Sequence, residues 1–156
     1  MPILIDLYQV LEDKWIRLDN MEPIGDAERV IVSVARLGAD RDLFERSGLL
    51  LGVELAVTDR VAEIEALLQR LKLVVLNFDA FADGRGFSQA RLLRERFSFQ
   101  GDIRAQGEVL RDQLSFMQRC GISQFRLADC EDADLALSAF TDISENYQPE
   151  LRVYAG

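Results

Sequence analysis

One short segment combines glycine, arginine and hydroxyl side chains in a spacing that suits anion binding. From Asp83 to Ser88, Gly84 and Gly86 flank Arg85, and the segment joins a strand-like run to a helix-like run. Glycine lets backbone N–H groups turn toward a ligand, and a guanidinium can hold an oxyanion through two parallel hydrogen bonds. We predict a ligand site made by Asp83, Gly84, Arg85, Gly86 and Ser88. A tight turn that serves only the fold is the alternative.

Arg104 is a second unusual position, because it stands between two apolar residues in a run typical of a strand. A buried arginine needs an acidic partner or a ligand. A structural ion pair is favoured, and three acids are candidate partners: Asp83, Glu108 and Asp112. In the ligand interpretation, Arg104 faces the same anion as Arg85, and Gln106 joins the site at the carboxyl end of that strand.

Several kinds of catalytic site are absent from the sequence. The chain has no histidine, which removes the commonest general base and transition-metal ligand. Cys120 and Cys130 lack a Cys-x-x-Cys spacing, so we expect both to be reduced and non-catalytic. No P-loop, flavin, nicotinamide or iron–sulfur motif is present. We therefore expect no metal and no cofactor.

Charge and length narrow the class of protein. The 156 residues fit one domain, and the net charge of −9 disfavours nucleic acid or an anionic membrane as the main partner. Between residues 83 and 119, however, seven arginines outnumber five acids. No basic leader precedes a long apolar core, and no run approaches the ~18 apolar residues of a membrane span. We expect a cytoplasmic protein.

Apolar periodicity predicts a mixed α/β chain. Residues 1–20 read as an N-terminal hairpin or extended arm, and residues 29–145 as five strand-then-helix units. The expected strands are 30–35, 49–56, 72–78, 103–105 and 124–128, and the expected helices are 40–46, 59–71, 88–97, 108–120 and 132–143. Ser88 is the expected cap of the third helix. Such units imply a parallel sheet, with an open doubly wound, flavodoxin-like arrangement as first choice and a partial barrel as the alternative. Function then collects at the carboxyl ends of the strands.

Three segments resemble a known family. Residues 83–96, 101–114 and 117–121 together are similar to a bacterial domain-of-unknown-function family, number 934. That family is associated with sulfite reduction through gene neighbourhood with sulfite reductase. The resemblance implies a pathway and leaves the molecular activity open.

These observations support a leading hypothesis and two alternatives. The first is a non-catalytic accessory protein of assimilatory sulfite reduction that binds a sulfur oxyanion or sulfite reductase. The second is a small oxidoreductase or sulfonucleotide-handling enzyme that orients its substrate with Asp83, Arg85 and Arg104. The third is a protein–protein interaction module, such as a homodimer formed through exposed apolar residues of the N-terminal hairpin, namely Leu4, Tyr8, Trp15 and Ile16.

Overall fold

The computed structural model describes residues 3–79, 84–128 and 132–140. Within them, one sheet of eight strands has the order β2-β1-β8-β7-β6-β5-β4-β3. The strands are β1 (Ile3–Ile5), β2 (Val10–Leu11), β3 (Ile16–Arg17), β4 (Arg29–Ser33), β5 (Leu50–Leu55), β6 (Leu71–Phe78), β7 (Asp102–Gly107) and β8 (Gln124–Leu127). From β3 to β8 neighbouring strands are parallel, whereas β1 is antiparallel to both β2 and β8.

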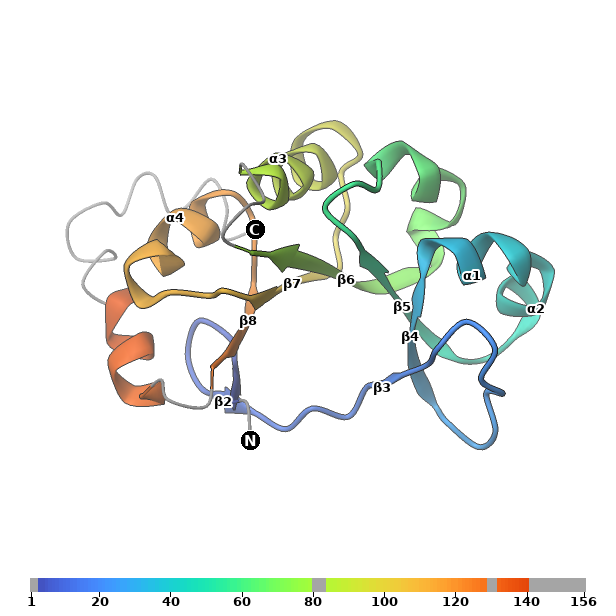
Figure 1. The fold of residues 1–156 in the computed structure, drawn as a ribbon, viewed down its shortest axis with the longest axis horizontal. Helices are drawn as coiled ribbons and strands as arrows, with labels where there is room; N and C mark the ends of the chain where they lie inside the picture. The colour runs from blue at the N-terminus through green and yellow to red at the C-terminus, as the bar shows by residue number, and fades with distance from the viewer. Residues whose placement is uncertain (1–2, 80–83, 129–131, 141–156) are drawn as a thin grey trace.

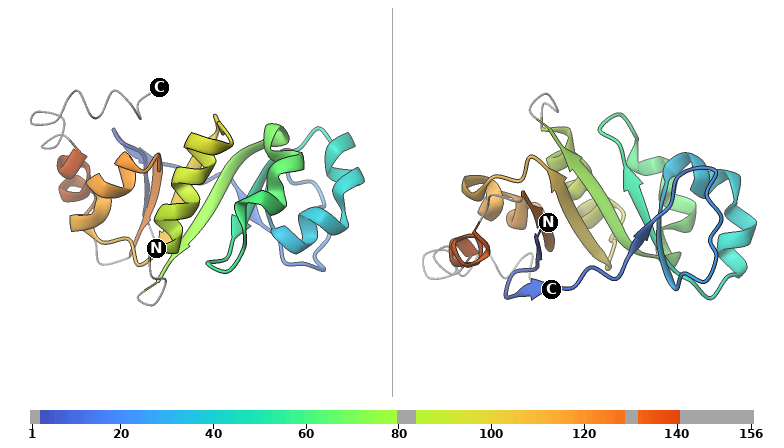
Figure 2. Two further views of the ribbon diagram at one scale, coloured as in Figure 1. Left: turned by 90° about the horizontal axis from the view of Figure 1, so that it is seen from above. Right: turned by 60° about the horizontal axis from the view of Figure 1, so that its bottom comes forward.

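Helices connect the parallel strands along one side of the curled sheet, as Figures 1 and 2 show. They are α1 (Val34–Ala39), α2 (Arg41–Arg46), the 3₁₀ helix η1 (Val61–Arg70), α3 (Arg85–Arg91), the π-helical turn η2 (Leu92–Arg96), the 3₁₀ turn η3 (Arg111–Gln113) and α4 (Leu114–Arg119). Residues 133–140 are also helical. The mixed α/β class and the mostly parallel sheet are as predicted. None of the described helices combines the length and apolar composition needed to cross a bilayer.

Strand order bears on the first choice of architecture. A doubly wound sheet reverses its order at a switch point. Strands β4 to β8 instead follow one another in chain order, without a reversal. The order therefore gives no support to a flavodoxin-like arrangement.

The N-terminal arm belongs to the sheet. β1 and β2 form an antiparallel hairpin, and β1 also pairs with β8. Residues 16 and 17, in the second apolar run of the predicted hairpin, instead pair as β3 with β4 at the opposite edge. A flat sheet would hold β2 and β3 about 33 Å apart, since seven strand spacings separate them. The five steps from Leu11 to Ile16 reach at most about 18 Å. The sheet must therefore curl, so that residues 12–15 cross its open side.

Side-chain alternation divides the core between the two faces of the sheet. The larger apolar core lies under the helices and includes Val74, Leu76 and Phe78 of β6. The opposite residues of β6, Leu73 and Val75, form a small cluster that packs against the arm. Because both faces are covered, β6 reads as a continuous apolar run, as expected.

The arm residues differ in exposure. Leu4 is buried in the sheet, and Trp15 packs against the cluster of Ile31, Leu73 and Val75. Of the residues proposed for a homodimer contact, only Tyr8 and Ile16 are strongly exposed. Leu4 is therefore not part of an exposed apolar patch.

Several boundaries differ from the predicted ones. Residues 34 and 35, predicted as the end of the first strand, instead begin α1, because the Ser33 hydroxyl accepts from the Arg36 N–H and caps a helix there. The third helix begins at Arg85 after a left-handed cap at Gly84, so Ser88 lies inside it, and the backbone N–H of Ser88 donates to the Gly84 carbonyl. The helix predicted from Glu108 begins only at η3. Residues 108–110 lie outside the helix, where the Glu108 N–H donates to the Phe78 carbonyl at the end of β6 and Leu110 has extended backbone angles.

Candidate functional site

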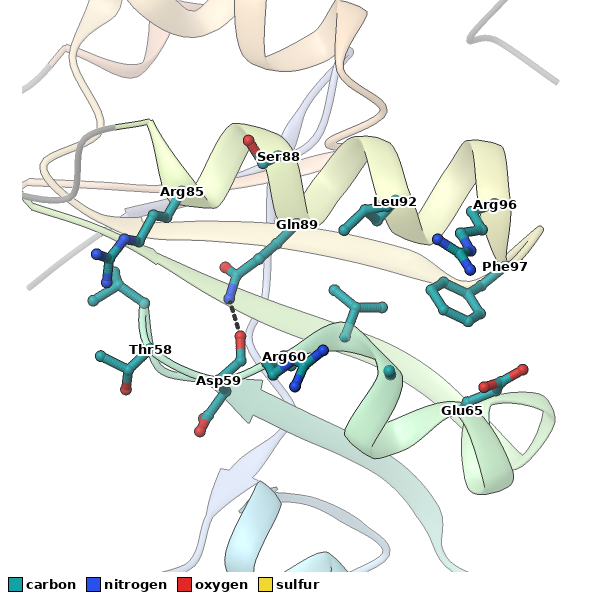
Figure 3. A pocket seen from close by; sticks show the side chains of 13 residues that line it. Thr58, Asp59, Arg60, Glu65, Arg85, Ser88, Gln89, Leu92, Arg96 and Phe97 are labelled. Carbon is teal, nitrogen blue, oxygen red and sulfur yellow. Dashed lines mark hydrogen bonds between the residues drawn. The ribbon is translucent and has the colours of Figure 1, made fainter.

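An open groove of about 760 Å³ lies on the helix-covered face of the sheet. One wall is α3 with η2, and the other is η1 with the loop that precedes it (Figure 3). The lining residues are Val57, Thr58, Asp59, Arg60, Val61, Ala62, Glu65, Arg85, Ser88, Gln89, Leu92, Arg96 and Phe97. We call this space the arginine groove, because three guanidinium groups border it.

The three arginines come from separate elements. Arg85 reaches from α3 toward Thr58, while Arg60 and Arg96 approach from opposite walls (Figure 3). Among the described residues, no side-chain hydrogen bond or ion pair engages Arg60 or Arg85. The Arg96 guanidinium lies over the ring of Phe97, 5.8 Å from its centroid. These groups can therefore donate to an oxyanion without first breaking an ion pair.

The acids of the arginine groove offset this charge only in part. The Asp59 carboxylate accepts a hydrogen bond from the Ala56 N–H at 2.8 Å and points away from the groove (Figure 3). Glu65 is exposed on η1. Three cations thus face one carboxylate that remains open to the groove, although the whole chain is acidic.

Gln89 fixes the two walls relative to each other. Its side chain is only 5% exposed, and Nε2 donates to the carbonyls of Ala56 and Asp59, both at 3.0 Å. These two acceptors set the orientation of the amide, because the reversed amide would point oxygen at oxygen. Its Oε1 atom has no partner among the described residues. Gln89 therefore holds the loop that carries Arg60 against the helix that carries Arg85.

The π-helical turn shapes the far end of the arginine groove. The Phe97 N–H donates to the Leu92 carbonyl at 3.0 Å, which is a bond to the fifth preceding residue. Such a turn widens the helix and changes the direction of the residues that follow. It places Arg96 and Phe97 in the lining.

The family comparison covers this site. Residues 52–154 match a family described as "Bacterial protein of unknown function (DUF934)". The chain belongs to this family. The match includes the whole arginine groove and begins inside β5, so the arm lies outside it. Among curated proteins, none matches the chain.

Within the DUF934 match, the predicted site residues separate into different roles. Arg85 and Ser88 line the arginine groove. Gly84 starts α3 with φ of 77°, and Gly86 is buried against Phe78, where a Cβ atom would lie 2.6 Å from Cε1 of the ring. Gly86 thus lets α3 approach β6. Asp83 lies outside the described residues.

Arg104 lies on the other face of the sheet. It is buried, and it donates from Nε to Gln124 Oε1 at 3.0 Å and from Nη1 to Asp13 Oδ2 at 3.3 Å. Burial lowers the pKa of the Arg104 guanidinium, and the Asp13 carboxylate opposes that shift. The structural ion pair is present, but its acid is Asp13 of the arm.

The other acids proposed for Arg104 do not take this role. Glu108 and Asp112 make no ion pair with it, and Asp83 lies outside the described part of the chain. Gln106 shares the face of Arg104 and donates to Asn77 Oδ1 at 2.8 Å. The sheet separates both side chains from Arg85, so Arg85 and Arg104 do not face one shared anion.

Sequence reasoning missed three groove residues. Arg60 precedes a helix without any motif, and Arg96 reads as part of a solvated helical face. Gln89 carried a usable signal, because it occupies a core position beside Ala90 and Leu93, where a polar side chain needs partners. Of the cysteines, Cys120 is buried and Cys130 lies outside the described residues.

Proposed function

We propose that this DUF934 chain is a non-catalytic accessory protein of assimilatory sulfite reduction that binds a sulfur oxyanion in the arginine groove. The observation that supports the proposal is the meeting of Arg60, Arg85 and Arg96 at one groove, with Arg60 and Arg85 unpaired among the described residues. Guanidinium groups suit sulfite and sulfate because they offer parallel donors to two oxygens. The link to sulfite reduction comes from the gene neighbourhood of the family. That pathway would place the protein in the cytoplasm.

The side chains of the arginine groove support binding rather than catalysis. The lining contains no cysteine, the chain has no histidine, and the Asp59 carboxylate is occupied by the Ala56 N–H. Among the described residues no hydrogen bond joins the Ser88 hydroxyl to a base, and Glu65, the carboxylate open to the groove, stands on the opposite wall (Figure 3). The groove thus offers donors for an anion rather than a nucleophile paired with a base.

We also infer that the sheet is a partial barrel of five strand–helix units. Its support is the chain order of β4 to β8, the curl required by the short arm, and the helices gathered on one side (Figure 1). In a barrel-like sheet, ligands bind at the carboxyl ends of the strands. The loop after β5 stands at that end and carries Thr58 to Arg60 into the arginine groove.

Replacing Arg85 with alanine should weaken sulfite binding by about tenfold or more, since a charge-assisted hydrogen bond is worth about 1.5–3 kcal/mol. Calorimetric titration of sulfite, sulfate and phosphate into wild type and Arg85→Ala measures this. Arg46→Ala is the matched control, because Arg46 is an exposed arginine at the end of α2. Absence of oxyanion binding to wild type, or an equal loss in the control, would contradict the proposal.

Sulfite reductase is the second candidate occupant of this region. Leu92 of the arginine groove is 40% exposed and Phe116 of α4 is 39% exposed, and such apolar groups suit a protein contact. If no oxyanion binds, the reductase should co-elute with wild type in gel filtration and fail to do so with Leu92→Asp. Retained co-elution of that variant would place the contact elsewhere.

A further inference from the structure

A second cavity, of about 450 Å³, lies on the face of the sheet that the arm crosses. We call it the arm cavity. Its walls come from β1, from the arm and from the amino ends of the parallel strands. The lining residues are Leu4, Leu11, Glu12, Lys14, Trp15, Arg29, Leu50, Lys72, Asp102, Arg104 and Gln124.

Cations outnumber acids in the arm cavity. Lys14, Arg29, Lys72 and Arg104 line it, and the two lysines are the only lysines of the chain. In the described structure, no side-chain ion pair or hydrogen bond engages Lys14, Arg29 or Lys72. Unpaired cations gathered from distant parts of a chain with net charge −9 indicate a site for an anion.

The two acids of the lining offset the charge of these cations only in part. The Asp102 carboxylate accepts a hydrogen bond from the Ser123 hydroxyl at 3.0 Å. Glu12 is exposed on the arm. Asp13, next to the lining, is shared by Arg104 and Arg126. Counting these groups with the lining gives five cations against three acids, and the excess of two positive charges suits a dianion.

Arg104 lines the arm cavity with a guanidinium that two partners hold in place. The residue is 2% exposed, and Nε and Nη1 are bonded to Gln124 and Asp13, whereas Nη2 has no partner among the described residues. A guanidinium has five N–H donors, so the N–H groups of Arg104 that these two bonds leave over can donate to acceptor oxygens. An oxyanion in this cavity would supply such oxygens.

We propose that the arm cavity binds a dianionic phosphoryl or sulfuryl group, held by Lys14 of the arm and by Arg29, Lys72 and Arg104 of the sheet. The group is either a free inorganic anion or the head of a small organic ester. The ester finds an apolar wall in the side chains of Leu4, Leu11, Trp15 and Leu50. This site is separate from the arginine groove, since the sheet lies between them.

Trp15 provides a direct test, because it is the single tryptophan of the chain and lines the arm cavity. Its fluorescence is followed while inorganic phosphate, sulfate or glycerol 3-phosphate is added to wild type, Lys72→Gln and Arg29→Gln. Both substituted side chains are accessible enough to be replaced without opening the core. We expect a saturable change in wild type and an affinity lower by about tenfold in each variant. Tighter binding of glycerol 3-phosphate than of inorganic phosphate identifies the ester as the ligand class.

Limited trypsin digestion gives a second readout that does not depend on fluorescence. Lys14 is exposed, and a ligand that joins the arm to the sheet should slow cleavage after Lys14 in wild type but not in Lys72→Gln. Arg46→Ala, which lies in neither lining, is the control and should behave as wild type in both assays. Arg85→Ala is measured beside it. Equal affinities in wild type and both cavity variants, or no protection at saturating glycerol 3-phosphate and phosphate, overturns the proposal. Loss of the signal in Arg85→Ala alone assigns the anion to the arginine groove instead.

Discussion

Replacing Arg94 with alanine should lower the free energy of unfolding by about 3 kcal/mol or more, because it removes the donor to three backbone carbonyls. Arg94 donates from Nε to Gly121 at 2.9 Å and from Nη1 to Phe99 at 2.8 Å and Gly101 at 2.7 Å. These carbonyls lie in two different connections, before β7 and after α4. Arg94 therefore ties three parts of the chain together.

The stem of Arg94 packs closely against Gly121. Gly121 has φ of 105°, and a Cβ atom there would lie 2.4 Å from Cγ of Arg94. The glycine thus makes room for the arginine stem. Burial lowers the pKa of the Arg94 guanidinium, and the nearby Asp102 carboxylate acts in the opposite direction. In Arg94→Ala the carbonyls of Phe99 and Gly121, two buried residues, lose their side-chain donor.

Urea unfolding followed by circular dichroism measures the effect. Arg94→Lys keeps the charge but cannot place planar donors on carbonyls from both connections, so its stability should fall between wild type and Arg94→Ala. Arg46→Ala is the matched control and should stay within about 0.5 kcal/mol of wild type. A similarly small change in Arg94→Ala would show that these bonds contribute little to stability.

The parallel sheet was predictable because its signals are local. β6 is a continuous apolar run because it is buried on both faces. The distance along the chain between successive strands reflects the helices that connect them. The family resemblance was also readable from contiguous motifs and is confirmed by the match to residues 52–154. Such features need no knowledge of which distant segments meet.

The candidate sites were harder to predict because distant residues form them. Arg60 and Arg85 meet only because Gln89 joins α3 to the loop before η1. Arg94 reads from sequence as an exposed helical arginine, yet it bonds a carbonyl 27 residues away. No periodicity encodes such a contact.

The contacts of the arm could not be predicted from the sequence for the same reason. Asp13 meets Arg104 across 91 residues, and this contact exists only because the sheet curls. By distance along the chain alone, the acids close to Arg104 in sequence were better candidates than Asp13 for its ion-pair partner. Topology determined the partner instead.

Replacing Asp13 with alanine should destabilise the protein by about 2 kcal/mol, because it leaves the buried guanidinium of Arg104 without its carboxylate partner. Asp13 Oδ2 accepts from Arg104 and also from Arg126. Arg104 is 2% exposed and keeps only Gln124 as a partner once Asp13 is gone. The partial exposure of Asp13 places the expected loss below the 3–5 kcal/mol typical of a fully buried pair.

The stability of a double variant shows why Asp13→Ala is destabilising. The loss of stability in Asp13→Ala is attributed to the unpaired charge of Arg104. If that is right, Asp13→Ala combined with Arg104→Met should be more stable than Asp13→Ala alone, because methionine removes the charge and fills its space. Glu12→Ala is the control for simple changes to the arm and should have little effect in urea unfolding. If the double variant is instead less stable than Asp13→Ala, Arg104 contributes through packing against β6 and β8 rather than through its charge. The arm would then be held mainly by Trp15 on the cluster of Ile31, Leu73 and Val75.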